Sequence, residues 1–565
     1  MGTRGSLVHT GLFLLLVLPI KGQEAGNPTL PPPQKEQTAV ISGSVVRKED
    51  GAPLKGATVQ LRNSEDRDHT MAARTGADGH FELHNLPSGK YRLTVSRNGY
   101  ATAEFGQKTP NDPGATFTLR AGQKMSDLQF SLVRAAVIGG RILDEDGEPM
   151  PNAMVSALRQ IYKNGKRQLE PADMSRSDDT GAYRLFGLKP GRYFVSAQPQ
   201  VWDRVAVDPE FSDTGKQGAE RAYGKTYYPG VATANKATSI ALKDGEEFIS
   251  ADILMKEVSV YRIRGKVANL VSNRGNRETS LQVQGRGGEV TWEFFGGVPS
   301  LKPDGSFEIA DMLPGEYTLN AFFGDEGKFY AGQADVDVTN ADVNGIIVTI
   351  GPGVTVTGRL VWEGKPAFDA SSDAMVILEP LESGMFWGGR ARIESSGQFN
   401  IKDVPPGEFN AGLEGLAKDC YIKETRLGDA DVANNTVRIT RNSSNTLQFT
   451  VSSKGGRIEG LVTNEDNLPV AGAWVVAVPE ESKRSIHRLY KSFTTDQYGH
   501  YELRGLAPGK YSLYAWERVE ENAWEDADFL KAFEDKGETV DMQDDDRKIV
   551  ELKLIAPKES ANKPE

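Results

Sequence analysis

The sequence predicts an all-β protein that folds as a tandem array of about five β-sandwich domains. Three observations lead to this prediction. The chain of 565 residues is too long for one hydrophobic core and is long enough for about four or five domains. Its 60 glycines and 29 prolines, with well-spread aromatic and β-branched residues, favour short strands and tight turns over helices. One motif also returns five times with the same internal spacing.

The N-terminal residues predict export. Arg4 precedes an apolar run, Leu12–Ile20, which is too short to span a bilayer and is typical of a secretory signal peptide. We place the signal peptide at 1–22 and a Pro-rich, extended linker at 23–38. We therefore expect a protein of the periplasm, the cell surface or the external medium, with no transmembrane segment in the mature chain.

The recurring motif consists of two glycines, ten positions apart, each followed two positions later by an aromatic residue. Side chains alternate along a strand, so both aromatic residues are expected to face the core, and a Pro-Gly or Ser-Gly turn joins the two strands. The signature residues are Gly79, Phe81, Gly89 and Tyr91; Gly181, Tyr183, Gly191 and Tyr193; Gly305, Phe307, Gly315 and Tyr317; Gly397, Phe399, Gly407 and Phe409; Gly499, Tyr501, Gly509 and Tyr511.

A second glycine-centred strand precedes each copy, for example "ISGSVV" around Gly43. In copies one, two and five it runs into an acidic, Pro-containing turn. Each copy can then form two packed sheets of about seven strands. The predicted domains are 39–133, 134–257, 258–350, 351–452 and 453–557, with a tail at 558–565.

This signature resembles the carboxypeptidase regulatory-like domain, a prealbumin-like β-sandwich also found behind the catalytic domain of some metallocarboxypeptidases. Copies one, two and five resemble it throughout, and copies three and four in their second halves. Thr226–Leu242 and the C-terminal segment also resemble exported repeat proteins of soil acidobacteria. The resemblance implies a transthyretin-like fold, and the wider carbohydrate-binding-like superfamily makes sugar binding an expectation. It does not imply peptidase activity, because the name describes an accessory domain.

The motifs of common hydrolases are absent from the sequence. No His has a Glu three positions later, and neither His-Glu-x-x-His nor Gly-x-Ser-x-Gly occurs. A Gly-x-x-x-x-Gly-Lys-Ser/Thr phosphate loop is also missing. We therefore expect no enzyme activity and no cofactor.

His80, Glu82 and His84 alternate along one strand and are residue types that bind zinc. In the other copies the residues at these three positions are not all possible metal ligands, so the repeated unit does not need a metal here. A solvated strand face is therefore the favoured interpretation, and a metal site is the alternative. The acidic turns Asp144–Asp146 and Glu465–Asp466 lack the ligand spacing of a calcium loop, and we expect them simply to form turns.

Aromatic residues beside glycines are the candidates for a sugar-binding platform. They are Trp292, Phe294, Phe295, Phe386 and Trp387. A core-facing strand is the favoured interpretation of the same residues, and the sugar platform the alternative, because Trp is mostly buried in sandwiches.

The charge pattern argues against a nucleic-acid partner. The formal net charge is −12, and no basic face is evident. The acidic stretch Glu517–Asp546 is predicted to be a solvated insertion with a short helix near Asp528–Phe533. Cys420 is the single cysteine, so no disulfide forms within one chain.

These observations predict a non-catalytic exported repeat protein that acts as a binding or scaffolding module of the cell envelope. The repeats are expected to provide length and to display loops. Its partners would be envelope proteins or polysaccharide. Polysaccharide binding is one alternative function, and an accessory role beside a metallocarboxypeptidase is another.

Overall fold

The computed structural model describes residues 38–64, 70–163, 165–199, 220–269, 279–286, 300–325, 328–367, 374–381, 388–441 and 443–556. The predicted signal peptide, nearly all of the linker and the tail lie outside these residues. The described chain is almost entirely β-structure, with one α-helix, α1 (Ala527–Lys531), and short 3-10 turns. The predicted all-β array is therefore confirmed. The 3-10 turns are Ala234–Lys236, Ala433–Asn435, Glu481–Lys483, His487–Leu489, Ala523–Glu525 and Glu534–Lys536.

The described strands form five modules, and the first two each consist of two sheets. In the first module the sheets are β4 (His80–Leu86), β1 (Ala39–Arg47) and β8 (Lys124–Leu132), and β3 (Thr70–Arg74), β2 (Thr58–Asn63), β5 (Gly89–Ser96), β6 (Ala103–Glu104) and β7 (Phe117–Leu119). In the second they are β12 (Ala182–Leu188), β9 (Ala136–Leu143), β17 (Glu247–Phe248) and β18 (Ile253–Leu254), and β11 (Lys166–Arg176), β10 (Met154–Lys163), β13 (Gly191–Gln198), β15 (Thr226–Tyr227) and β16 (Ile240–Leu242).

The third module is one continuous sheet folded on itself, because β25 pairs with strands on both of its sides. Its strand order is β20 (Ser280–Gly285), β23 (Gly315–Asp325), β24 (Lys328–Val338), β25 (Val343–Pro352), β19 (Glu257–Asn269), β22 (Ser306–Met312) and β21 (Ser300–Leu301). β14 (Glu220–Tyr223) leaves the second module and pairs with β19.

The fourth and fifth modules again have two sheets each. In the fourth they are β29 (Gln398–Val404), β26 (Val354–Glu363), β34 (Thr446–Ser452), β31 (Tyr421–Leu427) and β32 (Ala430–Asp431), and β28 (Gly389–Arg392), β27 (Met375–Pro380), β30 (Gly407–Glu414) and β33 (Thr436–Ile439). In the fifth they are β38 (His500–Leu506), β35 (Gly456–Thr463), β41 (Arg547–Ile549) and β42 (Leu552–Lys553), and β37 (Lys491–Thr494), β36 (Trp474–Pro479), β39 (Gly509–Trp516) and β40 (Glu538–Met542).

All five modules share one pairing scheme. The first strand of each module pairs antiparallel with the strand after the first signature glycine and parallel with the last strand of the module. All ten signature aromatic residues are buried, with exposed fractions from 0% at Phe409 to 5% at Tyr183. Each module therefore has its own apolar core between the signature strands and the strands that face them.

The glycine of each first strand is required by a close approach of backbone. A Cβ at Gly358 would overlap the carbonyl oxygen of Leu447 on β34 and the ring of Phe399. The equivalent glycines meet a carbonyl of their own module's last segment in the same way; they are Gly43, Gly140, Gly265 and Gly460. The parallel pairing of first and last strands thus depends on a residue without a side chain.

Each signature strand also contains one residue in the left-handed conformation, six positions after the first glycine. In chain order these are Asn85, Gly187, Asp311, Asp403 and Gly505, with φ between 57° and 75°. Only Gly, Asn and Asp adopt this conformation readily, and only these types occur here. The residue interrupts the ladder, as the register shift beside it indicates.

In four of the five modules the second signature aromatic residue is a tyrosine whose hydroxyl makes a hydrogen bond to the turn that precedes it. Tyr193 donates a hydrogen bond to the carbonyl of Lys189 at 2.8 Å. Tyr91, Tyr317 and Tyr511 do the same to the carbonyl four residues earlier, at 2.8–3.0 Å. Burial raises the pKa of Tyr193, so its hydroxyl stays protonated and able to donate. Phe409 fills the equivalent position of the fourth module without a hydroxyl.

We expect Tyr193→Phe to lower the free energy of unfolding of the second module by about 1 kcal/mol, because the Lys189 carbonyl loses its partner while the ring stays packed. Hydrogen exchange of peptides from β12 and β13 measures this local stability. Tyr498→Phe is the matched control, because it removes a hydroxyl from an exposed tyrosine. It should leave the hydrogen exchange of the β12 and β13 peptides unchanged.

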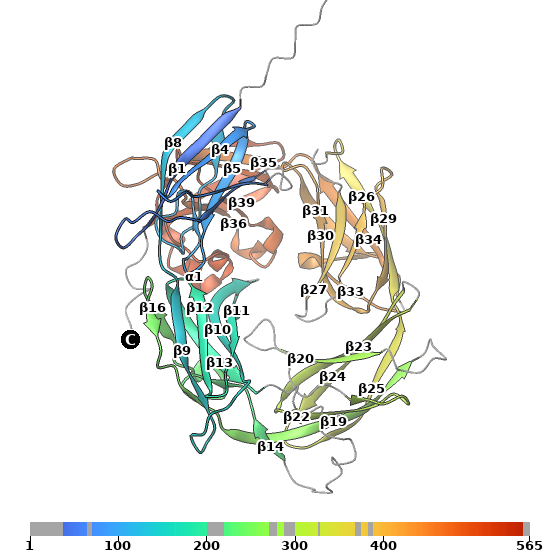
Figure 1. Cartoon of the computed structure of the whole chain (residues 1–565). Coiled ribbons are helices and arrows are strands. Elements are labelled where there is room, and N and C mark those ends of the chain that lie inside the picture. Colours follow the sequence, from blue (N-terminus) through green and yellow to red (C-terminus); the bar gives the residue numbers. More distant parts are fainter. Residues whose placement is uncertain are drawn as a thin grey trace, which may run out of the picture.

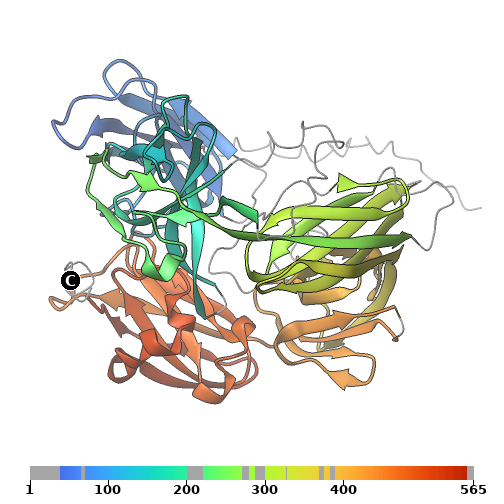
Figure 2. The ribbon, with the colours of Figure 1, turned by 90° about the horizontal axis from the view of Figure 1, so that it is seen from below.

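The five modules are arranged as a closed ring (Figures 1 and 2). The fifth module packs against the first through Lys108–Glu517 at 2.5 Å. It packs against the second through the rings of Tyr162 and Phe529, whose centroids are 6.5 Å apart. It also meets the fourth, where Tyr421 donates a hydrogen bond to Asp544 at 2.9 Å. The expectation that the repeats provide length is therefore wrong, since the last module returns to the first two.

The acidic stretch Glu517–Asp546 is not simply a solvated insertion. Trp524, Leu530 and Phe533 are buried and join Trp516 in a second apolar cluster of the fifth module. This cluster covers the outer face of β36, so that strand is buried on both faces. The helix predicted near Asp528–Phe533 is α1, which begins one residue earlier. Asp526 caps it by accepting hydrogen bonds from the backbone N–H groups of Asp528 and Phe529.

A candidate binding cleft between the third and fourth modules

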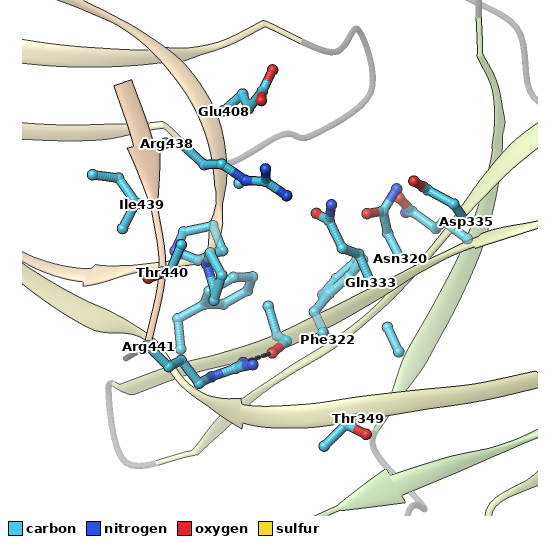
Figure 3. Close-up of a pocket in the computed structure, with 18 of the residues that line it drawn as sticks. Asn320, Phe322, Gln333, Asp335, Thr349, Glu408, Arg438, Ile439, Thr440 and Arg441 are labelled. Carbon is cyan, nitrogen blue, oxygen red and sulfur yellow. Dashed lines mark hydrogen bonds between the residues drawn. The ribbon is translucent and has the colours of Figure 1, made fainter. Parts of the chain in front are cut away.

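A cleft with a volume of about 460 Å³ lies where the third module meets the fourth (Figure 3). Its floor is the outer face of β20, β23, β24 and β25 in the third module. Its other wall is the Pro-Gly turn Pro405–Glu408 and the segment Arg438–Arg441 at the end of β33. The signature turn of the fourth module thus faces the sheet of the third module.

Three amide side chains stand side by side on the floor of the cleft. Gln282 on β20 is the cross-strand partner of Asn320 on β23, and Asn320 is the partner of Gln333 on β24. The residues next to them along the strands point into the core, which leaves these three on the outer face. In the described structure none of the three side chains makes a hydrogen bond to protein. Their donors and acceptors are available to a ligand.

The two sides of this amide row differ in character. On one side Asp335, two residues along β24 from Gln333, accepts a hydrogen bond from Thr318 at 2.9 Å and pairs with Arg286 at 3.1 Å. On the other side the half-buried rings of Phe322 and Phe329 lie 5.9 Å apart with an angle of 34° between their planes. The floor therefore changes from charged through neutral polar to aromatic.

Two arginines project from the fourth module. The Arg441 guanidinium donates to the carbonyl of Ala331 at 2.5 Å, and its Nε donates to the carbonyl of Pro352 at 3.4 Å, which ties the two modules together. Burial lowers the pKa of Arg441, although a guanidinium stays charged at neutral pH. Arg438 is the cross-strand neighbour of Glu408 and points across the cleft toward Asn320 and Gln333 (Figure 3).

The candidate metal ligands lie elsewhere, on the outer face of β4. The structure places His84 Nε2 3.4 Å from Glu82 Oε2, with both side chains largely exposed. His80 does not join them, and the described residues contain no group of three His, Cys, Asp or Glu side chains that could hold a metal ion. The acidic turn at Asp144 is held by hydrogen bonds from backbone N–H groups to its own carboxylate.

The aromatic residues named as candidates for a sugar platform all lie outside the described residues; they are Trp292, Phe294, Phe295, Phe386 and Trp387. The sequence analysis missed the pair Phe322 and Phe329. A signal was present in "NAFFGDEGKFY": because Phe323 faces the core, alternation places the adjacent Phe322 on the outer face.

Comparison with known proteins finds a family match for two of the five modules. The family model of the carboxypeptidase regulatory-like domain matches residues 40–133 and 457–525. These matches cover the first module and most of the fifth, and the other modules share their strand pairing. The acidobacterial origin stays a prediction.

Two curated proteins are similar to parts of the chain. Colossin-A from Dictyostelium discoideum is 21% identical over 391 residues, which are 62% of this chain and 3% of that protein. The protocatechuate 3,4-dioxygenase beta chain from Burkholderia cepacia is 31% identical over 106 residues, which are 17% of this chain and 44% of that protein. The chain therefore spans less than half of either relative.

Solved structures with similarity include bacterial pilins. The minor pilin GBS52 from Streptococcus agalactiae is 13% identical, with 39% of this chain and 97% of that chain covered and a TM-score of 0.22. The shaft pilin SpaA from Lactobacillus rhamnosus GG is 15% identical, with 40% and 98% covered and a TM-score of 0.19. Scores of this size carry no conclusion about this chain. Within its described residues, no helix is long and apolar enough to cross a membrane.

Proposed function

We propose that this protein is a non-catalytic binding scaffold of the cell envelope, which holds an envelope protein or polysaccharide in the cleft between the third and fourth modules. The observation that carries the proposal is the row of free amides, Gln282, Asn320 and Gln333, on the floor of that cleft. The signature aromatic residues are buried and pack in the cores of their modules. The three amides lie outside these cores and make no hydrogen bond within the described structure.

The arrangement of charges in the cleft supports binding rather than catalysis. Asp335 is held by Thr318 and Arg286, and Arg441 is held by two backbone carbonyls. A general acid or base needs freedom to exchange its proton with a substrate, and a nucleophile needs an adjacent base. The described lining contains no His or Cys, and apart from Asp335 and Glu408 its side chains do not act as acids or bases at neutral pH.

The ring arrangement supports the scaffolding half of the proposal. The ion pairs between the fifth module and the first include Lys108–Glu517 and Arg518–Asp112. In the second pair the Asp112 side chain is only 8% exposed and Arg518 is 47% exposed, so this pair is partly shielded from water and from screening by salt. A closed ring holds the third and fourth modules at a defined separation, as a binding cleft between modules requires.

Retention of envelope material by the immobilised protein tests this function. We expect the protein to retain a component of an envelope extract, and Gln333→Trp to abolish that retention by filling the cleft. Gln333 is exposed, so a large side chain is tolerated there without unfolding. Thr357→Trp is the matched control, at an exposed strand position of the fourth module outside the cleft.

Either of two results would contradict the proposal. Retention that is equal for the protein and for Gln333→Trp would place binding elsewhere. Turnover of a peptide, ester or glycoside substrate by the purified protein, lost in Gln333→Trp, would make the cleft a catalytic site.

A further inference from the structure

We infer that the cleft between the third and fourth modules binds a neutral saccharide chain, whose hydroxyl groups meet the amide row and one of whose sugar rings lies on the Phe322–Phe329 pair beside that row. This inference rests on the proposed binding function and specifies the ligand. It is carried by three properties of the described lining: the chemistry of the amide row, the placement of the aromatic pair and the balance of acidic and basic residues.

The amide row matches a ligand that carries many hydroxyl groups. A side-chain amide presents a donor and an acceptor in one plane, and a hydroxyl can accept from the first and donate to the second. Gln282, Asn320 and Gln333 are repeated across neighbouring strands at a spacing of about 4.8 Å, so a chain crossing the strands meets a new amide at each step.

The aromatic pair matches the flat, C–H-lined face of a sugar ring. Phe322 lies one row along β23 from Asn320, on the same outer face, and Phe329 lies beside it at 5.9 Å. Both rings are half-buried and keep part of their surface open to the cleft. Contact with an aromatic face adds favourable energy beyond the apolar area that it buries. Ile347, which is 64% exposed, is a further apolar side chain of the lining.

The charges of the cleft do not favour a charged ligand. Asp335 is paired with Arg286, and Arg441 is engaged by the carbonyls of Ala331 and Pro352. Arg438 has the oppositely charged Glu408 as its cross-strand neighbour, so the lining carries two carboxylates and two guanidinium groups. An acidic or a basic polymer would therefore meet like charges as well as opposite charges in the cleft.

Two other ligand classes fit the cleft less well. An extended peptide adds to a sheet by hydrogen bonds to a free strand edge, whereas the cleft lies on the face of strands that are already paired. A nucleic acid requires a basic surface to neutralise its phosphates, and the whole chain carries a net charge of −12. Hydroxyl groups remain the chemistry that the amides and the rings recognise together.

Affinity electrophoresis of the full-length protein tests the inference. The gels would contain laminarin, glucomannan, soluble starch or dextran as neutral polysaccharides, and alginate as a charged one. We expect saturable retardation by at least one neutral polymer. Phe322→Ala and Gln333→Ala should each weaken that binding about tenfold or more, which corresponds to the loss of one well-placed contact. Phe186→Ala is the matched control, because Phe186 is 65% exposed on a strand of the second module.

The results that overturn the inference are distinct from those that overturn the proposed function. The inference is wrong if no neutral polymer retards the protein, if only alginate does, or if both cleft variants migrate like the unaltered protein. Gln333→Ala keeps this test valid even if Phe322→Ala fails to fold, since Gln333 is exposed. If an envelope extract is still retained and Gln333→Trp still abolishes that retention, the binding function stands and the ligand is of another class.

Discussion

Trp516→Ala is expected to lower the free energy of unfolding of the fifth module by about 3–5 kcal/mol. Trp516 is 1% exposed and lies in the second apolar cluster of that module. Its ring stacks on Tyr514 at 5.0 Å and meets Phe533 edge-on at 5.7 Å. Removing the indole leaves a cavity that these neighbours cannot fill, because they are held by the strands and by α1.

Hydrogen exchange of β36 and β39 peptides measures this effect, since melting of a five-module chain is not a two-state transition. Tyr498→Ala, at a tyrosine of the same module that is 56% exposed, is the control and should change stability by less than about 0.5 kcal/mol. A small effect of Trp516→Ala would mean that the stretch after β39 does not pack on the module.

Gly358→Ala is expected to destabilise the fourth module by about 3 kcal/mol or more, at the upper end of the range for overpacking. The added methyl group would overlap the Leu447 carbonyl and the Phe399 ring, and the first of these is backbone that cannot rotate away. The parallel pairing of β26 with β34 would have to open. Protection of amides in these two strands measures the loss.

Gly412→Ala is the matched control in the same module. Gly412 lies in β30, is not in a left-handed conformation, and has no heavy atom within 4 Å of the place where its Cβ would lie. We expect this change to be neutral or slightly stabilising, because alanine restricts the unfolded chain more than glycine does. Equal effects of the two substitutions would refute the close-approach explanation for the first-strand glycines.

Much of the fold could be predicted because its determinants are local in sequence. Alternation alone places Phe81 on the core side of β4 and Tyr91 on the core side of β5, and the glycine spacing indicates the turn between these strands. The reason for Gly358 could not be predicted, because the carbonyl that excludes a side chain belongs to Leu447, a residue distant in sequence. The sequence shows only that Asn, Asp or Gly occurs six positions after each first signature glycine. That these residues, such as Asn85 and Asp311, have a left-handed backbone conformation became clear from the structure.

The candidate site was harder to predict because it depends on register and on the arrangement of modules. Gln282, Asn320 and Gln333 belong to three strands, and only the observed pairing brings them into one row. The second wall of the cleft comes from another module. The sugar-binding candidates predicted from the sequence were instead aromatic residues beside glycines, which lie outside the described residues. The prediction for Glu517–Asp546 was also wrong, because its many acidic residues hide the contribution of the buried Trp524, Leu530 and Phe533.

Hydroxyl-radical footprinting of the full-length protein, alone and with the envelope material that it retains, tests the central claim most directly, because it measures the solvent accessibility of side chains. The account predicts that oxidation of Phe322 and Phe329 falls on binding, while oxidation of the exposed Phe186 stays constant. Unchanged oxidation of Phe322 and Phe329, with protection at another surface such as the outer face of β4, would contradict it.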